Sequence, residues 1–402
     1  MPTIPSVNAT NENVLLALAF RPLFLSAAFF SLLAMLWWSY FWYNPFDWSV
    51  YGGPLWWHGH EMIFGFAVAV VVGFLLTAVQ TWTGVRSLHG WPLAALFMLW
   101  LCGRLLIAID FGLPAGAIAV IDCSFLIAAA IAMAYPVFAV KQWRNMVFVP
   151  VLMLLGLLNA YSHWAVSNDQ PVHATQALHV AIMLITLVMT IIGGRVIPMF
   201  TANGTGTPKV TAIKALEIVS VLSVALSALL IATPILMSTA VSELAASAIY
   251  AVAFVSNGWR LLRWRFWVCW QQPLVWSLHL AYAFIPLGFL GLFLHSVGLW
   301  SNVSSALHCF SAGAMGSLIL SMMARVSLGH TGRPLQVPPA LAVAFICIVT
   351  AGLVRVLLPM FQPAWLQQTV VVAGTLWVVA YGIFVVYYTP ILSKPRIDGR
   401  PG

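Results

Sequence analysis

The stretch Trp56-Trp57-His58-Gly59-His60-Glu61-Met62 is followed at once by an apolar run from Ile63 to Val79. Two imidazoles and a carboxylate therefore stand at the mouth of a segment long enough to cross a bilayer. Such groups are costly to bury in hydrocarbon unless a partner or a bound ligand stabilises them. The stretch predicts a binding site near one membrane face, completed by other helices that end at that face.

The composition indicates a polytopic membrane protein. Of the 402 residues, 62% are hydrophobic and 6% are charged, whereas a soluble domain carries about 25% charged residues. Because one span needs about 20 apolar residues, we predict an all-α bundle of about twelve transmembrane helices, forming one domain over residues 1–402. Residues 1–15 are expected to form a polar N-terminal tail, and residues 390–402 a basic C-terminal tail. The expected spans are 16–42, 61–80, 92–109, 115–139, 147–165, 174–199, 212–234, 241–258, 274–296, 304–324, 338–358 and 366–388.

The basic residues predict the orientation of the bundle. Lys and Arg fall in alternate connections, and the intervening connections hold Asp47, Asp110 and Asp169. Because cytoplasmic loops are enriched in Lys and Arg, both termini are expected in the cytoplasm. Arg104 and Arg355 are exceptions, since they lie inside expected spans. The basic residues are scattered despite the net charge of +8, so we expect no nucleic-acid partner.

Most of the histidines map to the outer side of this topology. Neutral imidazole is the commonest ligand for transition metals in proteins and the usual axial ligand of b-type haem. Several imidazoles at one depth, from different helices, are what an intramembrane metal centre requires. For each of them, a hydrogen-bonded interfacial histidine is the simpler alternative. The candidate outer-side ligands are His58, His60, His163 and His308, with His179 as a fifth.

The spacing of the opening stretch limits the roles of its residues. If the helix already begins at His58, then His58 and His60 point about 200° apart. They would serve two centres, or one would be a ligand and the other a hydrogen-bonding partner. His58 and Glu61 would share a face. Glu61 would then accept the imidazole N–H, relay a proton, bind a metal directly, or simply pair with a neighbour at the interface.

Other candidates map to the inner side. His279 and His330 would form a second metal centre there if both are ligands. Arg195, Arg325 and Arg333 leave the membrane at the same face, where they would bind haem propionates or an anionic headgroup. The alternative for these arginines is ordinary anchoring of cytoplasmic loops.

Several motifs resemble those of the NnrS family of bacterial haem- and copper-containing inner-membrane proteins, which are associated with nitric oxide metabolism. The matching segments are Phe20–Phe24, Trp57–Gly65, Gly73–Ala78, Trp82–Gly84, Gly193–Asn203 and Ser327–Pro334. They run through both halves of the chain. The resemblance implies a twelve-helix protein with haem b and copper, formed in the denitrification or nitric oxide response. The family pattern also includes histidines matched by His163, His279 and His308.

Three functions remain open at this point. The first is a nitric oxide reductase that forms nitrous oxide at a His-ligated haem–metal centre, with Glu61 as a proton relay. The sequence has no CxxCH motif, so covalent haem is not expected, and the electrons would come from an external quinol or cytochrome. The second is a protective protein that binds nitric oxide without turnover. The third is a transporter of a metal or metal–nitrosyl species, which would require a midplane site.

Overall fold

The computed structural model describes residues 13–236 and 242–399, and these residues form helices joined by short connections, with no strand among them. The prediction of an all-α polytopic bundle is confirmed. The long helices and their π-helical segments are α1 Phe20–Tyr43, α2 Pro54–His60, η2 Glu61–Ala67, α3 Val68–Thr83, α4 Gly90–Ala108, α5 Ala115–Ala139, α6 Phe148–Ser167, α7 Pro171–Thr205, α8 Lys214–Leu236, α9 Glu243–Arg263, α10 Pro273–Ser296, α11 Val303–His308, η5 Cys309–Met315, α12 Gly316–His330, α13 Pro339–Phe361 and α14 Leu366–Leu392. Short 3₁₀ turns are η1 Val14–Leu16, η3 Trp143–Asn145, η4 Phe266–Val268 and η6 Pro363–Trp365.

Eleven continuous helices among the described residues are long and apolar enough to cross a membrane. The helix at the remaining expected span is α9, whose 21 residues include one Glu and two Arg. The positions of the two ends of the helical chain argue that α9 crosses as well. Arg21, at the start of α1, donates hydrogen bonds from Nη1 to the backbone oxygens of Leu392 (2.7 Å) and Lys394 (2.9 Å), at the end of α14. The first and last helices therefore meet at one end of the bundle, which requires an even number of crossings, as predicted.

The predicted tails are only partly within the described chain. Most of the predicted N-terminal tail, residues 1–12, lies outside the described residues, and η1 begins at Val14, within the last residues of that predicted tail. At the other end α14 continues to Leu392, so the predicted tail of residues 390–402 begins inside the last helix.

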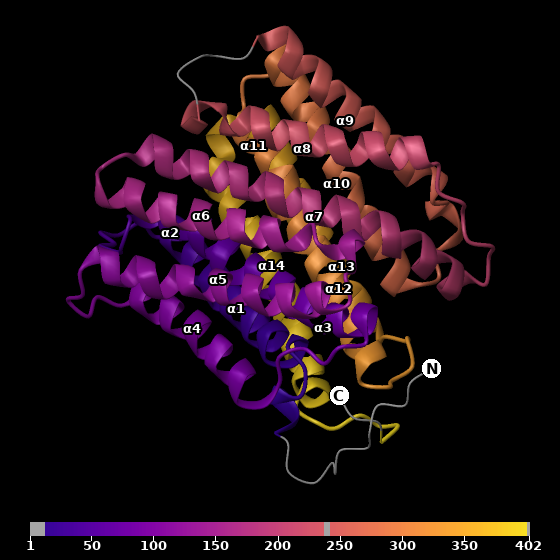
Figure 1. Cartoon of the computed structure of the whole chain (residues 1–402). Helices are drawn as coiled ribbons and strands as arrows, with labels where there is room; N and C mark the ends of the chain where they lie inside the picture. Colours follow the sequence, from indigo (N-terminus) through magenta and orange to yellow (C-terminus); the bar gives the residue numbers. More distant parts are fainter. Residues whose placement is uncertain (1–12, 237–241, 400–402) are drawn as a thin grey trace.

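Helix α7 is the centre of the packing. It contacts α6, α8 and α10, and it also touches α2, η2 and η5. In Figure 1 it runs through the middle of the bundle, between α4 and α5 on one side and α8 and α9 on the other. Its 35 residues correspond to about 52 Å of helix, longer than the roughly 30 Å hydrocarbon core. The C-terminal turns of α7 therefore extend into the membrane interface.

Two spans contain a π-helical segment, and in both a histidine comes immediately before it. Segment η2 follows His60, and η5 follows His308. A π-turn adds a residue to the helical turn and occurs often at functional sites. Around η5 the helices approach closely, because a side chain at Gly313 would overlap the ring of Phe284, and one at Gly352 would touch the Gly313 backbone. Both glycines are needed for α10, η5 and α13 to pack together.

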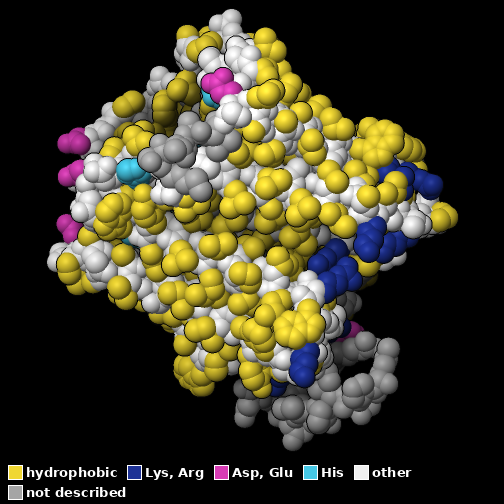
Figure 2. Space-filling view, turned by 45° about the horizontal axis from the view of Figure 1, so that its top comes forward, with side chains coloured by type: hydrophobic (Ala, Val, Ile, Leu, Met, Phe, Trp, Pro, Cys, Tyr) yellow, Lys and Arg dark blue, Asp and Glu magenta, His cyan; other side chains and the backbone are white. Residues whose placement is uncertain are grey.

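Charged side chains divide the bundle into two ends. Figure 2 shows hydrophobic side chains over the middle of the surface, Lys and Arg along one side and most of the visible Asp and Glu along the opposite side. We call the end with the α5–α6 and α7–α8 connections the basic end. The end with Asp47, Asp110 and Asp169 is the acidic end. The basic and acidic connections that alternate along the sequence thus lie at opposite ends of the folded chain.

Candidate functional site

A cavity of about 780 Å³ lies at the acidic end of the bundle. It is enclosed by the ends of α1 and α13 and by the starts of α2, α7, α11 and α14. Most of its lining is aromatic or aliphatic. Three imidazoles from three helices line it: His58, His179 and His308. Cofactor sites are typically apolar pockets of about 300–1,000 Å³ with a few convergent polar groups, and this cavity has that character.

His308 has a fixed tautomer. Its Nδ1–H donates to the backbone oxygen of Ser304, one helical turn earlier, at 2.7 Å. The lone pair therefore lies on Nε2. A histidine that ligates a metal usually donates its other ring N–H to a carbonyl or carboxylate, which fixes the ring and raises its basicity. His308 is arranged in this way.

His58 has an unsatisfied nitrogen. Its ring stacks on Trp38, with centroids 4.3 Å apart and planes inclined by 3°. Its Nδ1 is buried and has no hydrogen-bond partner among the described residues. Leaving a buried polar atom unpaired costs about 1–3 kcal/mol.

Arg355 of α13 also lines the cavity. The residues that line the cavity include no Asp or Glu, so the guanidinium faces a space without a carboxylate partner. A charge within a membrane span is costly and usually marks a binding site. The cavity thus combines nitrogen donors with one positive charge, which suits an anionic ligand that contains a metal.

A second assembly, the polar cluster, lies beside the cavity. It joins the α2–η2 boundary to α4, α5 and α6, and none of its six members is more than 4% exposed. Its members are His60, Glu61, Arg104, Asp122, Asn159 and His163.

Both ring nitrogens of His60 face oxygen atoms. Nδ1 lies 2.9 Å from Glu61 Oε1, and Nε2 lies 2.7 Å from Asn159 Oδ1. Nε2 is also 3.3 Å from Asp122 Oδ2, which accepts a hydrogen bond from Asn159 Nδ2 at 2.6 Å. With acceptors at both nitrogens, the geometry suits a doubly protonated imidazolium.

His163 is bonded on both sides as well. Tyr51, in the connection between α1 and α2, donates from its hydroxyl to His163 Nδ1 at 3.0 Å, and His163 Nε2–H donates to Asp122 Oδ2 at 3.2 Å. Burial raises the pKa of the Tyr51 phenol above its usual value. The phenol therefore stays protonated and remains a donor, which fixes the tautomer of His163.

Arg104 balances the charge of the polar cluster. Its two terminal nitrogens form ion pairs with Glu61 and Asp122. A buried ion is tolerated when it is paired and its remaining hydrogen bonds are made. Two cations, Arg104 and an imidazolium at His60, then face two carboxylates, and the cluster is neutral. Gly103 leaves room for this arrangement, because a Cβ there would press against the Asp122 carboxylate.

A single indole separates the cavity from the polar cluster. Trp56 lines the cavity and stacks on His60, with centroids 4.3 Å apart and planes inclined by 25°. The two assemblies are therefore neighbours.

Comparison with known families agrees with the architecture. The family model described as NnrS protein matches residues 14–396. The chain belongs to the NnrS family. The match spans both the cavity and the polar cluster, and it confirms the resemblance found in the sequence. No curated protein matches the chain.

The structure divides the five outer-side histidines of this NnrS-family chain between two sites. His58, His179 and His308 line the cavity, whereas His60 and His163 belong to the polar cluster. The opposite directions predicted for His58 and His60 agree with this division. Among the described residues, a ring nitrogen of His60, a ring nitrogen of His163 and an oxygen of Asp122 lie within 4.8 Å of one another, close enough to hold a metal ion.

Of the roles left open for Glu61, a hydrogen bond with His58 is not formed among the described residues, whereas pairing with neighbours is. Glu61 pairs with His60 and Arg104. The prediction of a shared face assumed a regular α-helix, but η2 begins at Glu61, and the Arg104 charge attracts the carboxylate toward α4.

The inner-side histidines have separate surroundings. His279 Nε2–H donates to Thr201 Oγ1 at 2.9 Å, and His330 packs against Phe20, with ring centroids 5.6 Å apart. Neither belongs to a group of three metal-donor side chains within the described residues. Their role as metal ligands stays a prediction.

The three arginines predicted as cofactor contacts do not line the cavity. Arg195 donates to the Asn145 side chain at 2.8 Å, and the Arg325 guanidinium lies 3.9 Å from the centroid of the Phe200 ring. Together with Arg333 they belong to spans that reach the basic end there, away from the cavity. Arg355 of α13 lines the cavity instead, and binding of a cofactor or headgroup by the three inner-side arginines stays a prediction.

Sequence reasoning missed four residues of the two sites: Arg104, Asp122, Asn159 and Arg355. A signal was available for the two arginines, because each interrupts an apolar span. The same signal applies to Asp122 in α5. Asn159 carries no charge, and only the packing of α5 on α6 reveals its role.

Proposed function

We propose that the chain is a haem b protein of the bacterial inner membrane that reduces nitric oxide to nitrous oxide at the cavity. The observation that carries the proposal is the lining of the cavity: three imidazoles and one arginine, with no carboxylate, around an apolar space. Imidazole is the usual axial ligand of b-type haem, and an arginine suits a propionate. The Nε2 of His308, whose Nδ1–H is bonded to a backbone oxygen, is the nitrogen that such a group would satisfy.

Each cavity residue has a role in this proposal. His308 would hold the iron, because its Nδ1–H is already committed to a backbone carbonyl. Arg355 would pair with a propionate. His58 and His179 are the other imidazoles available to a molecule in the cavity. When bound, haem b would supply an iron that exchanges electrons and offers an open coordination position to nitric oxide.

Reduction of two nitric oxide molecules to nitrous oxide and water consumes two electrons and two protons. The electrons would come from an external quinol or cytochrome. Nitric oxide is small and neutral, so it would reach the cavity through the bilayer. Protons need polar groups, and the polar cluster lies behind Trp56. Glu61 is the proposed proton relay, since it contacts the ring of His60.

Copper, which the family resemblance implies, would find donors at His60, Asp122 and His163. The present bonding fits copper poorly. Arg104 already neutralises Asp122, and both imidazoles are committed to hydrogen bonds. No step of the proposed reaction requires copper.

One observation favours a second function, capture of nitric oxide without turnover. Both carboxylates of the polar cluster are paired with Arg104. If they stay paired, they hold no exchangeable proton for reduction. The cavity would then bind haem and nitric oxide in a protective role.

The test separates the two functions on purified full-length protein. Haem content is first measured from the reduced-minus-oxidised spectrum, and nitric oxide uptake and nitrous oxide release are then followed with a chemical reductant. Reduction predicts nitrous oxide in excess of the haem present. Stoichiometric uptake without nitrous oxide, at full haem loading, supports capture and rejects the reductase.

Glu61→Gln sharpens this test. We expect it to keep haem and to slow turnover by about 10²–10⁴-fold, the usual contribution of a positioned proton-transfer group. His295→Ala is the matched control, because His295 lies at the same end, is exposed, and bonds only to the nearby Trp300 carbonyl among the described residues. Unchanged turnover in Glu61→Gln would remove Glu61 from the mechanism.

A further inference from the structure

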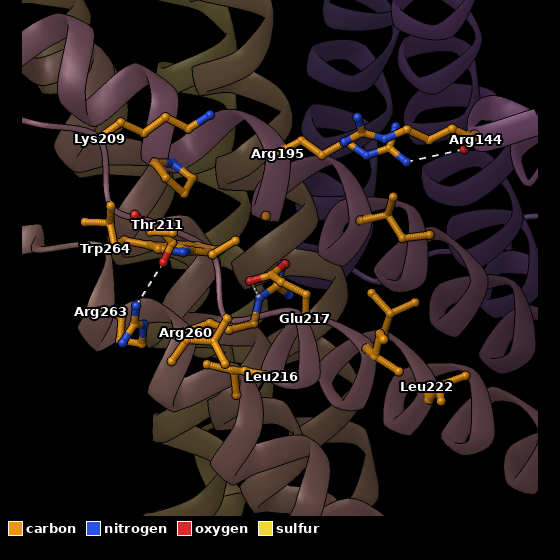
Figure 3. Close-up of a pocket in the computed structure, with 18 of the residues that line it drawn as sticks. Arg144, Arg195, Lys209, Thr211, Leu216, Glu217, Leu222, Arg260, Arg263 and Trp264 are labelled. Atoms are coloured by element: carbon orange, nitrogen blue, oxygen red, sulfur yellow. Dashed lines mark hydrogen bonds and ion pairs between the residues drawn. The ribbon is translucent and has the colours of Figure 1, made fainter. Parts of the chain in front are cut away.

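A second pocket, of about 830 Å³, lies at the basic end and has no part in the proposed reaction. It is formed by the η3–α6 region, the C-terminal half of α7, the α7–α8 connection, α8 and the end of α9. We call it the basic pocket. Figure 3 shows its side chains.

The basic pocket has an excess of positive charge. Five cationic residues and one carboxylate line it: Arg144, Arg195, Lys209, Arg260, Arg263 and Glu217. The carboxylate is already used, because Glu217 receives two hydrogen bonds from Arg260, at 2.7 and 3.1 Å. Four cations therefore lack a carboxylate partner in the pocket.

Arg260 is a structural member of this pocket. It is 1% exposed and, besides Glu217, donates to the hydroxyl of Tyr282 at 2.8 Å. Its guanidinium also lies 5.3 Å from the centroid of the Trp264 ring. Gly194 gives it room, since a Cβ at that position would overlap the guanidinium. These contacts anchor α9 to α8 and α10 and leave the other cations to face the pocket.

Two of those cations are held in place by backbone oxygens. Arg195 Nη2 donates to the carbonyl of Arg144 at 3.4 Å, and Arg263 Nη2 donates to the carbonyl of Thr211 at 2.9 Å. A carbonyl positions a guanidinium without neutralising it. The charges are thus fixed toward the pocket and remain available.

The basic pocket is polar at one end and apolar at the other. In Figure 3, Lys209, Arg195 and Arg144 lie along one end, and Leu216 and Leu222 lie at the opposite end. The cations belong to the part of the bundle where α7 leaves the hydrocarbon core. The pocket therefore matches an amphiphile with an anionic head and an apolar tail, placed at the membrane interface.

We propose that the basic pocket binds an anionic phospholipid. Its phosphate would lie among Arg144, Arg195 and Lys209 at the polar end, and an acyl chain would run along the apolar faces of α7 and α8. Basic pockets between transmembrane helices bind anionic lipid headgroups through this combination of charge and apolar surface. A free phosphate would match the cations and leave the apolar end unused.

Native mass spectrometry of the delipidated full-length protein tests the proposal. The probes are dioleoyl phosphatidylglycerol, dioleoyl phosphatidylcholine and inorganic phosphate. We expect preferential binding of one phosphatidylglycerol molecule, which inorganic phosphate does not displace. Arg195→Gln/Lys209→Gln should weaken phosphatidylglycerol binding about 25-fold, since each cation near an anionic headgroup contributes about fivefold.

The matched control is Arg265→Gln/Lys394→Gln. It removes two exposed cations from the same end of the bundle, outside the basic pocket. We expect it to bind phosphatidylglycerol like the unchanged protein. Lys209→Gln alone, at an exposed loop position, serves if the double variant does not fold, and should weaken binding about fivefold.

Three results would overturn the proposal. Equal losses of phosphatidylglycerol binding in the pocket variant and the control would mean that binding depends only on the overall charge of the protein. Displacement of phosphatidylglycerol by inorganic phosphate, or equal binding of phosphatidylcholine, would mean that the pocket is a site for a free anion or has no preference for anionic lipid.

Discussion

His58 and His60 are two residues apart on one helix, yet their surroundings are opposite. His58 faces the cavity, and its buried Nδ1 has no partner among the described residues. His60 is fully buried in the polar cluster, with acceptors at both nitrogens. The hydrogen bonds of the His60 ring are complete within the protein, whereas the His58 ring lines a cavity and leaves one nitrogen without a partner among the described residues. Proximity in the sequence therefore says little about a shared role.

The same contrast applies to the two intramembrane arginines. Arg104 pairs with two carboxylates, whereas Arg355 lines a cavity that has none. One arginine is neutralised by the protein, and the other has its charge directed at whatever the cavity binds. Both pairs of residues agree with the proposal that the cavity binds a ligand, whereas the charges of the polar cluster are paired within the protein.

The largest effect should come from replacing a cavity histidine with a residue that has no side-chain nitrogen. Loss of a supporting group behind a metal ligand lowers metal affinity by about 10–100-fold. We expect His308→Ala, which removes the proposed ligand itself, to weaken haem binding by more than that. His60→Gln, which keeps amide groups for its hydrogen bonds, should keep haem. Haem content per protein from absorbance measures both. The reverse outcome, haem lost in His60→Gln and retained in His308→Ala, would exchange the roles of the two sites.

The next largest effect is a loss of stability when one of the two intramembrane arginines is replaced. Arg104→Met leaves Glu61 and Asp122 buried without their cation, so we expect the free energy of unfolding to fall by about 3–5 kcal/mol. Arg355→Met breaks no pair with a lining carboxylate. It should leave the haem-free protein as stable as before and weaken haem binding. Denaturant unfolding in detergent, with and without haem, compares the two variants. A similar loss of stability in both would show that the cavity also depends on its charge for folding.

Much of the fold follows from the sequence because hydrophobic length determines membrane spans. Helices occur at all twelve expected positions. The second span nevertheless begins at Pro54 rather than near Glu61, because proline is favoured at the first position of a helix and adds a turn that the polar residues concealed. The π-helical segments could not be predicted, since they depend on neighbours such as Phe284 that pack on Gly313.

The sequence predicts at which end of the bundle the site lies, but not which residues belong to it. The alternation of charged connections was enough to place five histidines at one end. Which of them meet depends on how α4, α5 and α6 pack against the α2–η2 helix, and these contacts join residues far apart in the chain, such as Glu61 and Arg104. Arg104 itself was visible as a charge within an apolar span. Its partner Asp122 carried the same signal, and reading the two as an ion pair would have located the polar cluster.

The smallest effect concerns the edge of the polar cluster, where it meets the loop at the acidic end. Tyr51→Phe removes the hydrogen bond to His163 Nδ1, so we expect a loss of about 0.5–1.5 kcal/mol. Tyr43→Phe, at a side chain that is 72% exposed, should cost nothing. Because burial raises the pKa of Tyr51, the unfolded chain ionises first as the pH rises above about 10. Ionisation then favours the unfolded state of the unchanged protein, so its advantage over Tyr51→Phe should narrow in that range. An advantage that stays constant from neutral to alkaline pH would mean that the pKa of Tyr51 is not raised in the folded protein.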